Sequence, residues 1–447
     1  MISPSLPRLS IIGLGKLGAP AAAVFASKGY EVIGVDINKK TVAAINAGRA
    51  PVQETGLEKL VHANKNRLSA MTDVDKAVLA SNASFIIVPT PSKKSGAFSN
   101  THVLQAVTKI GKSLRGKKDR HIVVVCSTVM PGAMDEIIRL CLERASGLVV
   151  GKDVGLCYNP EFIALGSVIH DMLNPDIILI GESDRKSGDF LEALYKRVCE
   201  SKPAFKRMNF VNAEIAKISI NTFVTTKISY ANMLANICDR LPNADCDIVT
   251  NAIGSDSRIG EKYLKGATGY GGPCFPRDNA AFAALAKKIH AKADLATATD
   301  SMNNYQPQRL MELIHRVAPQ AKNISIVGLS YKPDTPVTDE SPGIKLACLL
   351  QQNNYKLTVY DRIIGQAAAE ILPRHIKIAA SLGEASAGQD AIFVMVADDA
   401  YAKPDWLKAK KPKKSVIIID CWRIFKNKRI PPHAVLVHPG QHTKAVS

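Results

Sequence analysis

The sequence predicts an α/β protein with two Rossmann-like, doubly wound domains joined by a long central helix within a helical dimerisation region. A glycine-rich turn near residue 13 separates two short apolar runs, and further apolar runs alternate with helical stretches. A second series of the same kind begins at Asn323. Such alternation is typical of buried parallel sheets. We expect doubly wound domains at 1–205 and 319–447 and a helical domain at 206–318.

Composition limits the classes of partner. The chain has 447 residues, of which 46% are hydrophobic and 22% charged, as in globular proteins of two or three domains. Its net charge of +18 favours anionic ligands. The densest basic run, 408–414, is typical of a solvated surface, and only 6% of residues are aromatic. We therefore expect no nucleic-acid partner.

The nine cysteines are dispersed, without a CxxC pair or zinc-ligand spacing. This usage is typical of reduced thiols in the cytoplasm, and it predicts no metal site. Met1–Pro7 does not resemble a signal peptide, and no apolar run reaches the roughly 18–20 residues of a membrane span. We expect a cytoplasmic protein without a membrane partner.

The first apolar runs form a dinucleotide-binding pattern. A strand at Leu9–Ile12 precedes GLGKLG, a helix at Ala19–Ser27 follows, and a strand at Glu31–Val35 ends in Asp36. The three glycines suit a tight turn, close approach of the pyrophosphate and close packing of helix on strand. The Asp36 carboxylate suits ribose hydroxyls and repels a 2′-phosphate, which favours NAD over NADP. The predicted cofactor contacts are Gly13, Gly15, Leu17, Gly18, Asp36, Thr90 and Thr128.

Polar side chains follow three further predicted strands. Thr90, Thr128 and Glu161 each lie in a loop after an apolar run. Since ligands bind beyond the carboxyl ends of parallel strands, we expect these side chains near the glycine-rich turn. Each loop singly is also compatible with an ordinary turn. The apolar runs are Phe85–Val88, Ile122–Cys126, Val154–Tyr158 and Ile177–Ile180.

A long helix is predicted at about 212–241, where neither Gly nor Pro interrupts the pattern. Lys217 and Asn221 share one face of it, because they are four residues apart. The pair suits a plain surface or a polar cleft. A helix of this length suits a spine between domains or between subunits, so we expect a homodimer or a larger homo-oligomer.

A Gly/Pro-rich segment, Gly269–Asp278, holds Cys274 just before a helical stretch at about 279–318. The N-terminus of a helix stabilises a thiolate, the reactive form of cysteine. A small buried cysteine in a tight loop explains the segment equally well.

The second domain repeats the strand–turn–helix order without GxGxxG. Lys332 and Arg423 follow its first and last predicted strands and suit phosphate binding. The strands are expected at Ile324–Gly328, Lys356–Tyr360, Ala391–Val396 and Val416–Ile419, with a helix at Pro342–Gln351.

Over essentially its whole length the chain resembles the UDP-glucose 6-dehydrogenase group of nucleotide-sugar dehydrogenases. The cysteine block, with Phe275 beside the cysteine, resembles that of the UDP-glucose branch more than those of the UDP-N-acetylmannosamine or GDP-mannose branches. The matching blocks are GLGKLG, VPTP, STVMPG, NPEF, the helix with Lys217 and Asn221, DSRIG, GYGGPCFPRD and YKPDT.

The resemblance implies a four-electron oxidation of a UDP-sugar, from the C6 alcohol to the carboxylate of UDP-glucuronate, with two NAD and one water. Cys274 matches the nucleophile, which carries a thiohemiacetal and then a thioester. Lys217 and Asn221 match the groups that stabilise an oxyanion. The resemblance further implies that Asp278 and Thr128 order a water, that Glu161 is the acid–base group, and that the product serves polysaccharide biosynthesis.

The resemblance also implies a set of residues that hold the UDP-sugar. In the family, the residue that Arg258 matches reaches across a dimer interface. The implied substrate contacts are Glu161, Phe162, Lys217, Asn221, Arg258, Tyr263, Lys265, Gly271, Lys332 and Arg423.

Three positions depart from the family pattern. Leu165 stands where the family has an acid, and Ile177 and Asp339 stand where it has arginines. Because the glycine-rich turn and Asp36 remain, our hypothesis is a rearranged cofactor site. The alternatives are a dehydrogenase of another nucleotide sugar, of the UDP-N-acetylhexosamine or UDP-galactose type, and a catalytically impaired nucleotide-sugar-binding protein. A two-electron dehydrogenase has no use for Cys274.

Overall fold

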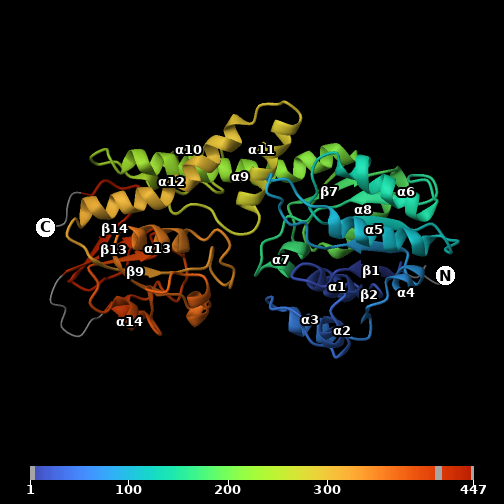
Figure 1. The fold of residues 1–447 in the computed structure, drawn as a ribbon, viewed down its shortest axis with the longest axis horizontal. Helices are drawn as coiled ribbons and strands as arrows, with labels where there is room; N and C mark the ends of the chain where they lie inside the picture. Colours follow the sequence, from blue (N-terminus) through green and yellow to red (C-terminus); the bar gives the residue numbers. More distant parts are fainter. Residues whose placement is uncertain (1–5, 408–414, 444–447) are drawn as a thin grey trace. The chain divides into compact units, whose positions relative to one another are not determined.

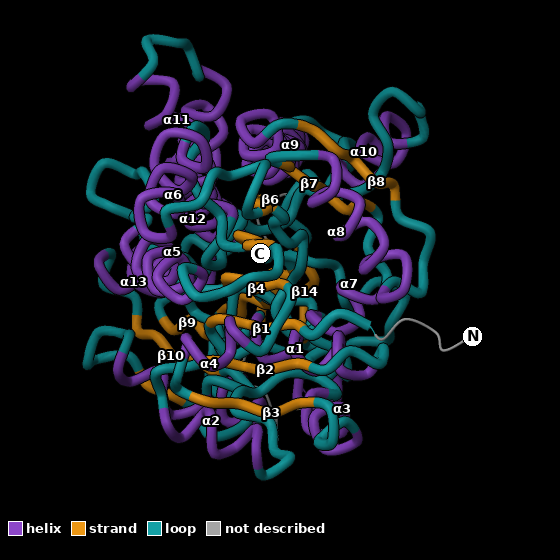
Figure 2. Tube along the Cα trace, turned by 90° about the vertical axis from the view of Figure 1, so that its right-hand side faces the viewer, coloured by secondary structure: helices purple, strands orange, loops and turns teal. Residues whose placement is uncertain are grey.

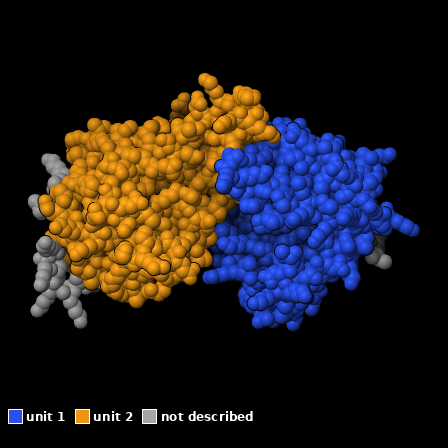
Figure 3. Space-filling view, in the orientation of Figure 1, with its two compact units in different colours: residues 1–219 blue, residues 220–447 orange. Residues whose placement is uncertain are grey.

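The computed structural model describes residues 6–407 and 415–443, so the basic run 408–414 lies outside the described residues. The chain divides into two compact units, Met1–Ser219 and Ile220–Ser447 (Figure 3). The division falls within one long helix, α9 (Phe210–Cys238). The predicted fold class is confirmed, because each unit contains a Rossmann-like sheet and α9 joins the two.

The first unit is built on an eight-stranded sheet with the order β3-β2-β1-β4-β5-β6-β7-β8. One detail differs from the expected parallel sheet, because β7 is antiparallel to β6. Strands buried on both faces are apolar in either direction, so the sequence pattern does not reveal their orientation. The strands are β1 Leu9–Ile12, β2 Val32–Val35, β3 Leu68–Met71, β4 Ala83–Ile86, β5 Ile122–Val125, β6 Gly155–Tyr158, β7 Ile177–Glu182 and β8 Ala204–Met208.

Helices cover both faces of this sheet and bury two apolar cores. Figure 2 shows α4, α5 and α6 on one face, with α3, α7 and α8 on the other. The helices are α1 Gly18–Ser27, α2 Lys39–Asn46, α3 Leu57–Ala63, α4 Val74–Leu79, α5 Thr101–Leu114, the π-helix η1 Met134–Arg139, α6 Leu140–Ser146, α7 Val168–Leu173 and α8 Arg185–Val198.

Polar side chains account for the start of one strand that the sequence pattern misplaced. The strand predicted at Phe85–Val88 is β4, which starts two residues earlier and includes the buried Ser84. The Ser84 hydroxyl lies 2.8 Å from His121 Nε2 and 2.7 Å from the Ser10 hydroxyl. Burial also lowers the pKa of His121 to about 3, so this imidazole is neutral. A satisfied polar cluster of this kind interrupts the apolar run by which a buried strand is recognised.

The second unit is built on a six-stranded sheet with the order β11-β10-β9-β12-β13-β14, and all its paired strands are parallel (Figure 1). The helix α12 packs against α13 on one side of it. The strands are β9 Asn323–Val327, β10 Lys356–Tyr360, β11 Lys377–Ile378, β12 Ala391–Val394, β13 Val416–Asp420 and β14 Ala434–Val437.

The helical stretch expected at 279–318 is two helices, α11 and α12, separated at 289–293. His290 has a φ of +56°, a left-handed conformation that ends α11. Across the described ranges, no helix is both long enough and apolar enough to cross a membrane. The helices are α10 Cys246–Gly254, α11 Phe275–Lys288, α12 Asp294–Val317, α13 Pro342–Gln352 and α14 Leu382–Ser386, with 3₁₀ turns η2 Gly365–Glu370 and η3 Pro404–Leu407.

Candidate active site

The glycine-rich turn connects β1 to α1 at the carboxyl end of the first sheet. Gly13 has a φ of +97°, and a Cβ there would overlap the carbonyl of Ile87. A Cβ at Gly18 would overlap the carbonyl of Gly13, whereas a Cβ at Gly15 would meet no atom within 4 Å. Gly13 and Gly18 are therefore required by the packing of the backbone. Gly15 leaves open space at the start of α1, where a pyrophosphate lies in dinucleotide sites.

Asp36 is fixed beside this turn by the backbone. Its Oδ2 accepts a hydrogen bond from the Leu14 amide and its Oδ1 accepts one from the Asn38 amide, each at 2.8 Å. The side chain is half-buried, and each oxygen keeps a second lone pair. These acceptors suit the ribose hydroxyls of NAD, so the donors and acceptors present fit the cofactor that the sequence predicts.

The loops after β4 and β5 are joined by one serine. The Ser127 hydroxyl donates to the Val88 carbonyl at 2.7 Å and accepts from the Val88 amide at 3.0 Å. This pair of bonds holds the loop with Thr90 against the loop with Thr128. Thr90 is buried and Thr128 is partly exposed. The sequence prediction that these loops lie together is confirmed for this pair.

The segment after Thr128 is held by a buried carboxylate from α9. Glu214 accepts from the Gly132 amide at 2.7 Å and from the Met134 amide at 2.8 Å, at the start of η1. Its side chain is fully buried, and burial raises the pKa of Glu214 to about 7 despite the two amide donors. Glu214 therefore fastens the loop after β5 to the helix that carries Lys217.

Glu161 follows β6 and lies next to Lys217. The Lys217 ammonium donates to the Glu161 carbonyl at 2.5 Å and lies 4.3 Å from the centre of the Phe162 ring. Burial raises the pKa of the Glu161 carboxyl to about 7, against a hydrogen bond from Tyr195 and the charge of Lys217. A carboxyl that titrates near neutral pH can act as an acid in one step and as a base in another.

In the second unit, Cys274 is exposed and is the N-cap residue of α11. The turn before it requires glycine, because Gly272 has a φ of +83° and a Cβ there would press on the Tyr331 ring. The Gly272 amide donates to the Asp339 carbonyl at 2.8 Å. Burial, with repulsion from a Cys274 thiolate, raises the pKa of Tyr331 to about 12. The expected position of Cys274 before a helix N-terminus is confirmed.

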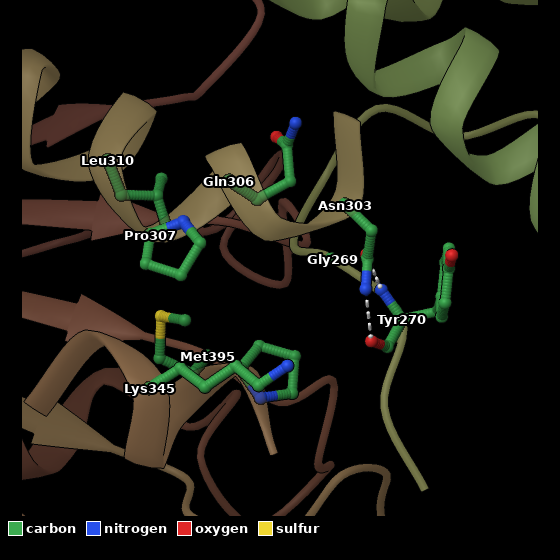
Figure 4. A pocket seen from close by; sticks show the side chains of 9 residues that line it. Gly269, Tyr270, Asn303, Gln306, Pro307, Leu310, Lys345 and Met395 are labelled. Atoms are coloured by element: carbon green, nitrogen blue, oxygen red, sulfur yellow. Dashed lines mark hydrogen bonds between the residues drawn. The ribbon is translucent and has the colours of Figure 1, made fainter. Parts of the chain in front are cut away.

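The other end of the cysteine segment is anchored to α12. Asn303 accepts from the Tyr270 amide at 2.7 Å and donates to the Tyr270 carbonyl at 3.0 Å (Figure 4). The Tyr270 hydroxyl donates to Asp300 at 2.6 Å and accepts from Asn279 at 2.9 Å. These bonds fix the backbone that leads to Cys274.

Asn221 and Asp278 lie together in the second unit. The Asn221 amide donates to Asp278 Oδ2 at 2.6 Å, and the Asp278 amide donates to the Cys274 carbonyl at 2.8 Å. Asp278 is 1% exposed and its other oxygen lies 3.4 Å from Arg277 Nε. Lys217 and Asn221 therefore make different contacts, the first with the Glu161 loop and the second with the first turn of α11.

The remaining predicted substrate residues of the second unit differ in exposure. Tyr263 is exposed, and Lys265 donates to the Trp422 carbonyl at 3.1 Å. Arg258 is also exposed and pairs with Asp256. Lys332 has its ammonium 5.9 Å from the Tyr331 ring centre, and Arg423 is buried against Asp245 at 2.8 Å and Asp247 at 3.3 Å. Gly271 is buried, and a Cβ there would overlap the Glu340 carbonyl.

The three departures from the family pattern lie in ordinary surroundings. Leu165 packs against the apolar core beside α1, and Ile177 begins β7. Asp339 is exposed and contributes its backbone carbonyl to the cysteine turn. None of the three disturbs the hydrogen bonds of Asp36 or Gly272 given above.

Three family models match the chain in order: the NAD binding domain of the UDP-glucose/GDP-mannose dehydrogenase family at residues 7–199, its central domain at 211–305 and its UDP binding domain at 325–427. The chain belongs to the UDP-glucose/GDP-mannose dehydrogenase family. It is an NAD-dependent enzyme that oxidises an alcohol of a nucleotide sugar.

Similar proteins of this family act on different sugars. The chain is 36% identical over 401 residues to the UDP-glucose 6-dehydrogenase AglM of Haloferax volcanii, covering 89% of this chain and 93% of the relative. It is 34% identical over 364 residues to a GDP-mannose 6-dehydrogenase of Pseudomonas aeruginosa, covering 80% and 82%. A UDP-glucose dehydrogenase structure from Pyrobaculum islandicum matches with a TM-score of 0.86 and 28% identity, covering 99% of this chain and 100% of that one.

Sequence reasoning missed several residues that support the site of this dehydrogenase. Glu214 lies three residues before Lys217, a spacing that places both on one side of α9 and was a usable signal. Ser127 is part of the STVMPG block, but its partner Val88 is remote in sequence. Tyr195 on α8 has no local motif, and the YKPDT block that begins at Tyr331 does not reveal that this ring lies against Gly272.

Proposed function

We propose that this dehydrogenase is a UDP-glucose 6-dehydrogenase that oxidises the C6 alcohol to a carboxylate and so forms UDP-glucuronate. The observation that carries the proposal is the exposed Cys274 at the N-terminus of α11, in a turn held by Asn303 and the Asp339 carbonyl. A two-electron alcohol dehydrogenase needs no thiol. The match to a UDP binding domain and the 36% identity to AglM support the nucleotide and the sugar.

The glycine-rich turn and Asp36 would hold NAD, which would supply the hydride acceptor for C6 in each of two oxidations. Between them, the Cys274 sulfur adds to the C6 aldehyde to form a thiohemiacetal. The second oxidation leaves C6 bound to sulfur as a thioester. Water then attacks the thioester carbon, the C–S bond breaks, and the thiol is regenerated with the carboxylate.

The charged and polar groups of the site have matching roles in this proposal. Lys217 and Asn221 stabilise negative charge on the C6 oxygen. Glu161, with its pKa near 7, takes a proton from water during hydrolysis. Asp278, fixed by the Asn221 amide, and Thr128 orient that water.

The decisive measurement is the number of NADH formed per sugar consumed. The purified chain is incubated with NAD and limiting UDP-glucose, and NADH absorbance is compared with the sugar lost. Two NADH per sugar support the proposal, and one per sugar overturns it. Cys274→Ser should lose at least a hundredfold in UDP-glucuronate formation while binding NAD normally. Wild-type rates in that variant would remove the thiol from the mechanism.

The same assay separates the second candidate, a GDP-mannose dehydrogenase, which the 34% identity over 80% of the chain favours. A panel of UDP-glucose, UDP-galactose, UDP-N-acetylhexosamines and GDP-mannose is compared by kcat/KM. A preference for GDP-mannose would overturn the UDP-glucose assignment and leave the cysteine chemistry standing. NADH release from none of these sugars would instead support an impaired, nucleotide-sugar-binding protein.

Substrate contacts in the second unit belong to the same proposal. Lys265, Lys332 and the exposed Tyr263 suit the diphosphate and the uridine. Arg423 requires a rearrangement to contact phosphate directly, because its guanidinium is paired with Asp245 and Asp247. We propose that its position stabilises the start of α10, whose N-cap is Asp245.

We also propose that the protein is a homodimer, with α9 as a contact surface. Phe223, Tyr230 and Ile237 are exposed and are spaced seven residues apart along α9. Such a stripe on one helix face is typical of a helix–helix contact. Sedimentation of the wild-type protein and of Phe223→Asp tests this proposal. If α9 is the dimer surface, the charge introduced in Phe223→Asp should dissociate the dimer. An equal mass for the two proteins would overturn the proposal. Arg258, exposed in the single chain, is proposed to act on the partner's substrate.

A further inference from the structure

One buried hydroxyl in the first unit lies between two oxygen acceptors. Tyr195 Oη lies 2.6 Å from Asn159 Oδ1 and 3.2 Å from Glu161 Oε1. Asn159 and Glu161 both belong to the segment after β6, and Tyr195 comes from α8. The hydroxyl has a single proton, so it cannot make a full hydrogen bond to both acceptors at once.

The orientation of the Asn159 amide is set by a third group. Asn159 Nδ2 donates to the Leu179 carbonyl on β7 at 2.9 Å. If the amide were turned over, its oxygen would face that carbonyl and its NH₂ would face Tyr195. The Leu179 carbonyl therefore keeps Asn159 Oδ1 directed at the tyrosine, as a permanent competitor for its proton.

We propose that Tyr195 is a positioning residue for Glu161, and that Asn159 and the Glu161 carboxylate compete for its single hydroxyl proton. The inference rests on the proposed function, in which Glu161 is the acid–base group. When Glu161 is ionised, the hydroxyl turns to the carboxylate and Asn159 Oδ1 loses its donor. When Glu161 is protonated, the hydroxyl returns to Asn159, and the carboxylic acid can donate to the tyrosine oxygen. Both forms of Glu161 thus find a hydrogen bond without movement of the backbone.

The other groups around Glu161 do not offer this exchange. Lys217 on α9 uses its ammonium on the Glu161 carbonyl, and its charge favours the ionised carboxylate. Cys126 after β5 and Cys199 after α8 are thiols whose pKa burial raises, so both remain neutral at working pH. Burial likewise raises the pKa of Tyr195, so its proton is retained. Among these neighbours, Tyr195 is the group whose hydrogen bond can follow the charge on Glu161.

The tyrosine ring is held independently of its hydroxyl. Tyr195 is 1% exposed, and its ring meets the Phe25 ring edge-on at 6.3 Å in the core beside α1. Tyr195→Phe therefore removes the hydroxyl and keeps the packing. Asn159→Leu should have the opposite effect on the hydrogen bond to Glu161. It removes the competing acceptor, so the Tyr195 hydroxyl proton remains available to Glu161.

The two substitutions should move the titration of Glu161 in opposite directions. Loss of a hydrogen bond to the carboxylate raises its pKa, by about one unit in Tyr195→Phe. Removal of the competitor strengthens that bond and lowers the pKa of Glu161, also by up to about one unit, in Asn159→Leu. A purely structural role for either residue predicts lower folded yield but no such opposed shifts.

The test follows the carboxyl C=O stretch of Glu161 by infrared difference spectroscopy across pH 5–9, with Glu161→Gln to identify the band. Tyr401→Phe is the matched control, because it deletes an equally buried tyrosine hydroxyl in the second unit and should leave the band unchanged. Opposed shifts in the two variants support the proposal. Shifts in the same direction, or none, overturn it. If either variant fails to fold, the predicted direction in the other decides alone.

The kinetic pH profile separates this inference from the proposed function. Under both proposals, the apparent pKa of UDP-glucuronate formation moves with the infrared titration in each variant. Opposed infrared shifts with an unmoved profile would support the shared proton and overturn Glu161 as the acid–base group. A profile that moves without any infrared shift would overturn the shared proton.

Discussion

The two sheets of this dehydrogenase begin with the same backbone arrangement and differ in what they leave available to a ligand. Gly13 follows β1 with a φ of +97°, and Gly328 follows β9 with a φ of +99°. A Cβ at Gly18 would overlap the Gly13 carbonyl, and a Cβ at Gly343 would overlap the Gly328 carbonyl in the same way. In both, a glycine at the start of the following helix permits close packing on the strand. The second sheet therefore has the close-packing geometry without the GxGxxG pattern.

The acids that end the second strand of each domain show the difference. Asp36 is half-buried and accepts two backbone hydrogen bonds, from Leu14 and Asn38. Asp361 is 3% exposed and accepts four, from Leu329, Ser330, Ile363 and Ile364.

A carboxylate has about four strong acceptor sites, so Asp361 is saturated by its own backbone and Asp36 is not. The same residue at the same place in a fold therefore serves a cofactor only where the backbone leaves some of its acceptor sites unused. This difference explains why only the first unit has the characteristics of an NAD site, although both have the turn.

The largest predicted effect tests the glycines. Gly18→Ala brings a methyl against a backbone carbonyl, which should cost roughly 3 kcal/mol or more of stability and abolish NAD binding. Gly343→Ala should cost a similar amount in the second unit and leave NAD affinity unchanged, because it repeats the same overlap there. Urea unfolding and NAD titration by calorimetry measure both quantities.

Gly15→Ala is the control for that pair. Its methyl meets no atom of the folded chain, so stability should change by less than about 1 kcal/mol. NAD affinity should still fall, by roughly tenfold to a hundredfold, because the methyl takes space reserved for the pyrophosphate. Unchanged affinity in Gly15→Ala would contradict the assignment of this turn to the cofactor.

A smaller effect tests the two acids. Asp361→Asn removes charge-assisted bonds from a buried, saturated group, and should cost about 2–4 kcal/mol of stability without altering NAD affinity. Asp36→Asn should cost less stability, about 1 kcal/mol, and should weaken the affinity for NAD by roughly tenfold. Equal stability losses in thermal unfolding of the two variants would contradict the assignment of Asp361 as a structural acid and Asp36 as a ligand-binding one.

The sequence was sufficient for features carried by local pattern. The βαβ order predicts the tight turn at Gly13, the close packing at Gly18 and the position of Asp36 beside them. The Gly/Pro-rich run predicts Cys274 before a helix. The strands β3 and β8 were not predicted, because polar residues interrupt both and neither forms an apolar run. Their sequences are LSAM and AFKRM. The antiparallel β7 escaped because an apolar run has no direction.

Contacts between segments remote in sequence account for the site contacts that were missed. The role of Ser127 in joining two loops is visible only once Val88 is seen to lie beside it. Asn159 is likewise recognised as a competing acceptor only from its contacts with Leu179 and Tyr195. The raised pKa values of Glu161 and Glu214 depend on burial, which tertiary packing sets and local sequence does not. Hydrogen-bond partners and the protonation they impose are therefore properties of the fold.

The last predicted effect concerns a third acid, Glu214. Glu214 has only two amide donors against the four of Asp361, and burial raises its pKa to about 7. A carboxyl whose folded pKa lies above its unfolded value of about 4.3 stabilises the fold below that value, and this contribution is lost as pH rises to 7. The stability of the first unit should thus decline between pH 4.5 and 7, by at most about 3 kcal/mol from this group.

Glu214→Gln isolates that contribution, since it cannot titrate and keeps the side-chain volume. Its urea-derived stability should be flatter than wild type between pH 4.5 and 7, apart from the slope that Glu161 contributes in both proteins. The variant also loses one of the two hydrogen bonds that Glu214 accepts from the Gly132 and Met134 amides. It should therefore be less stable than wild type at every pH, by about 1 kcal/mol. Parallel pH profiles for the two proteins would show that two backbone donors are already enough to keep the Glu214 carboxylate ionised.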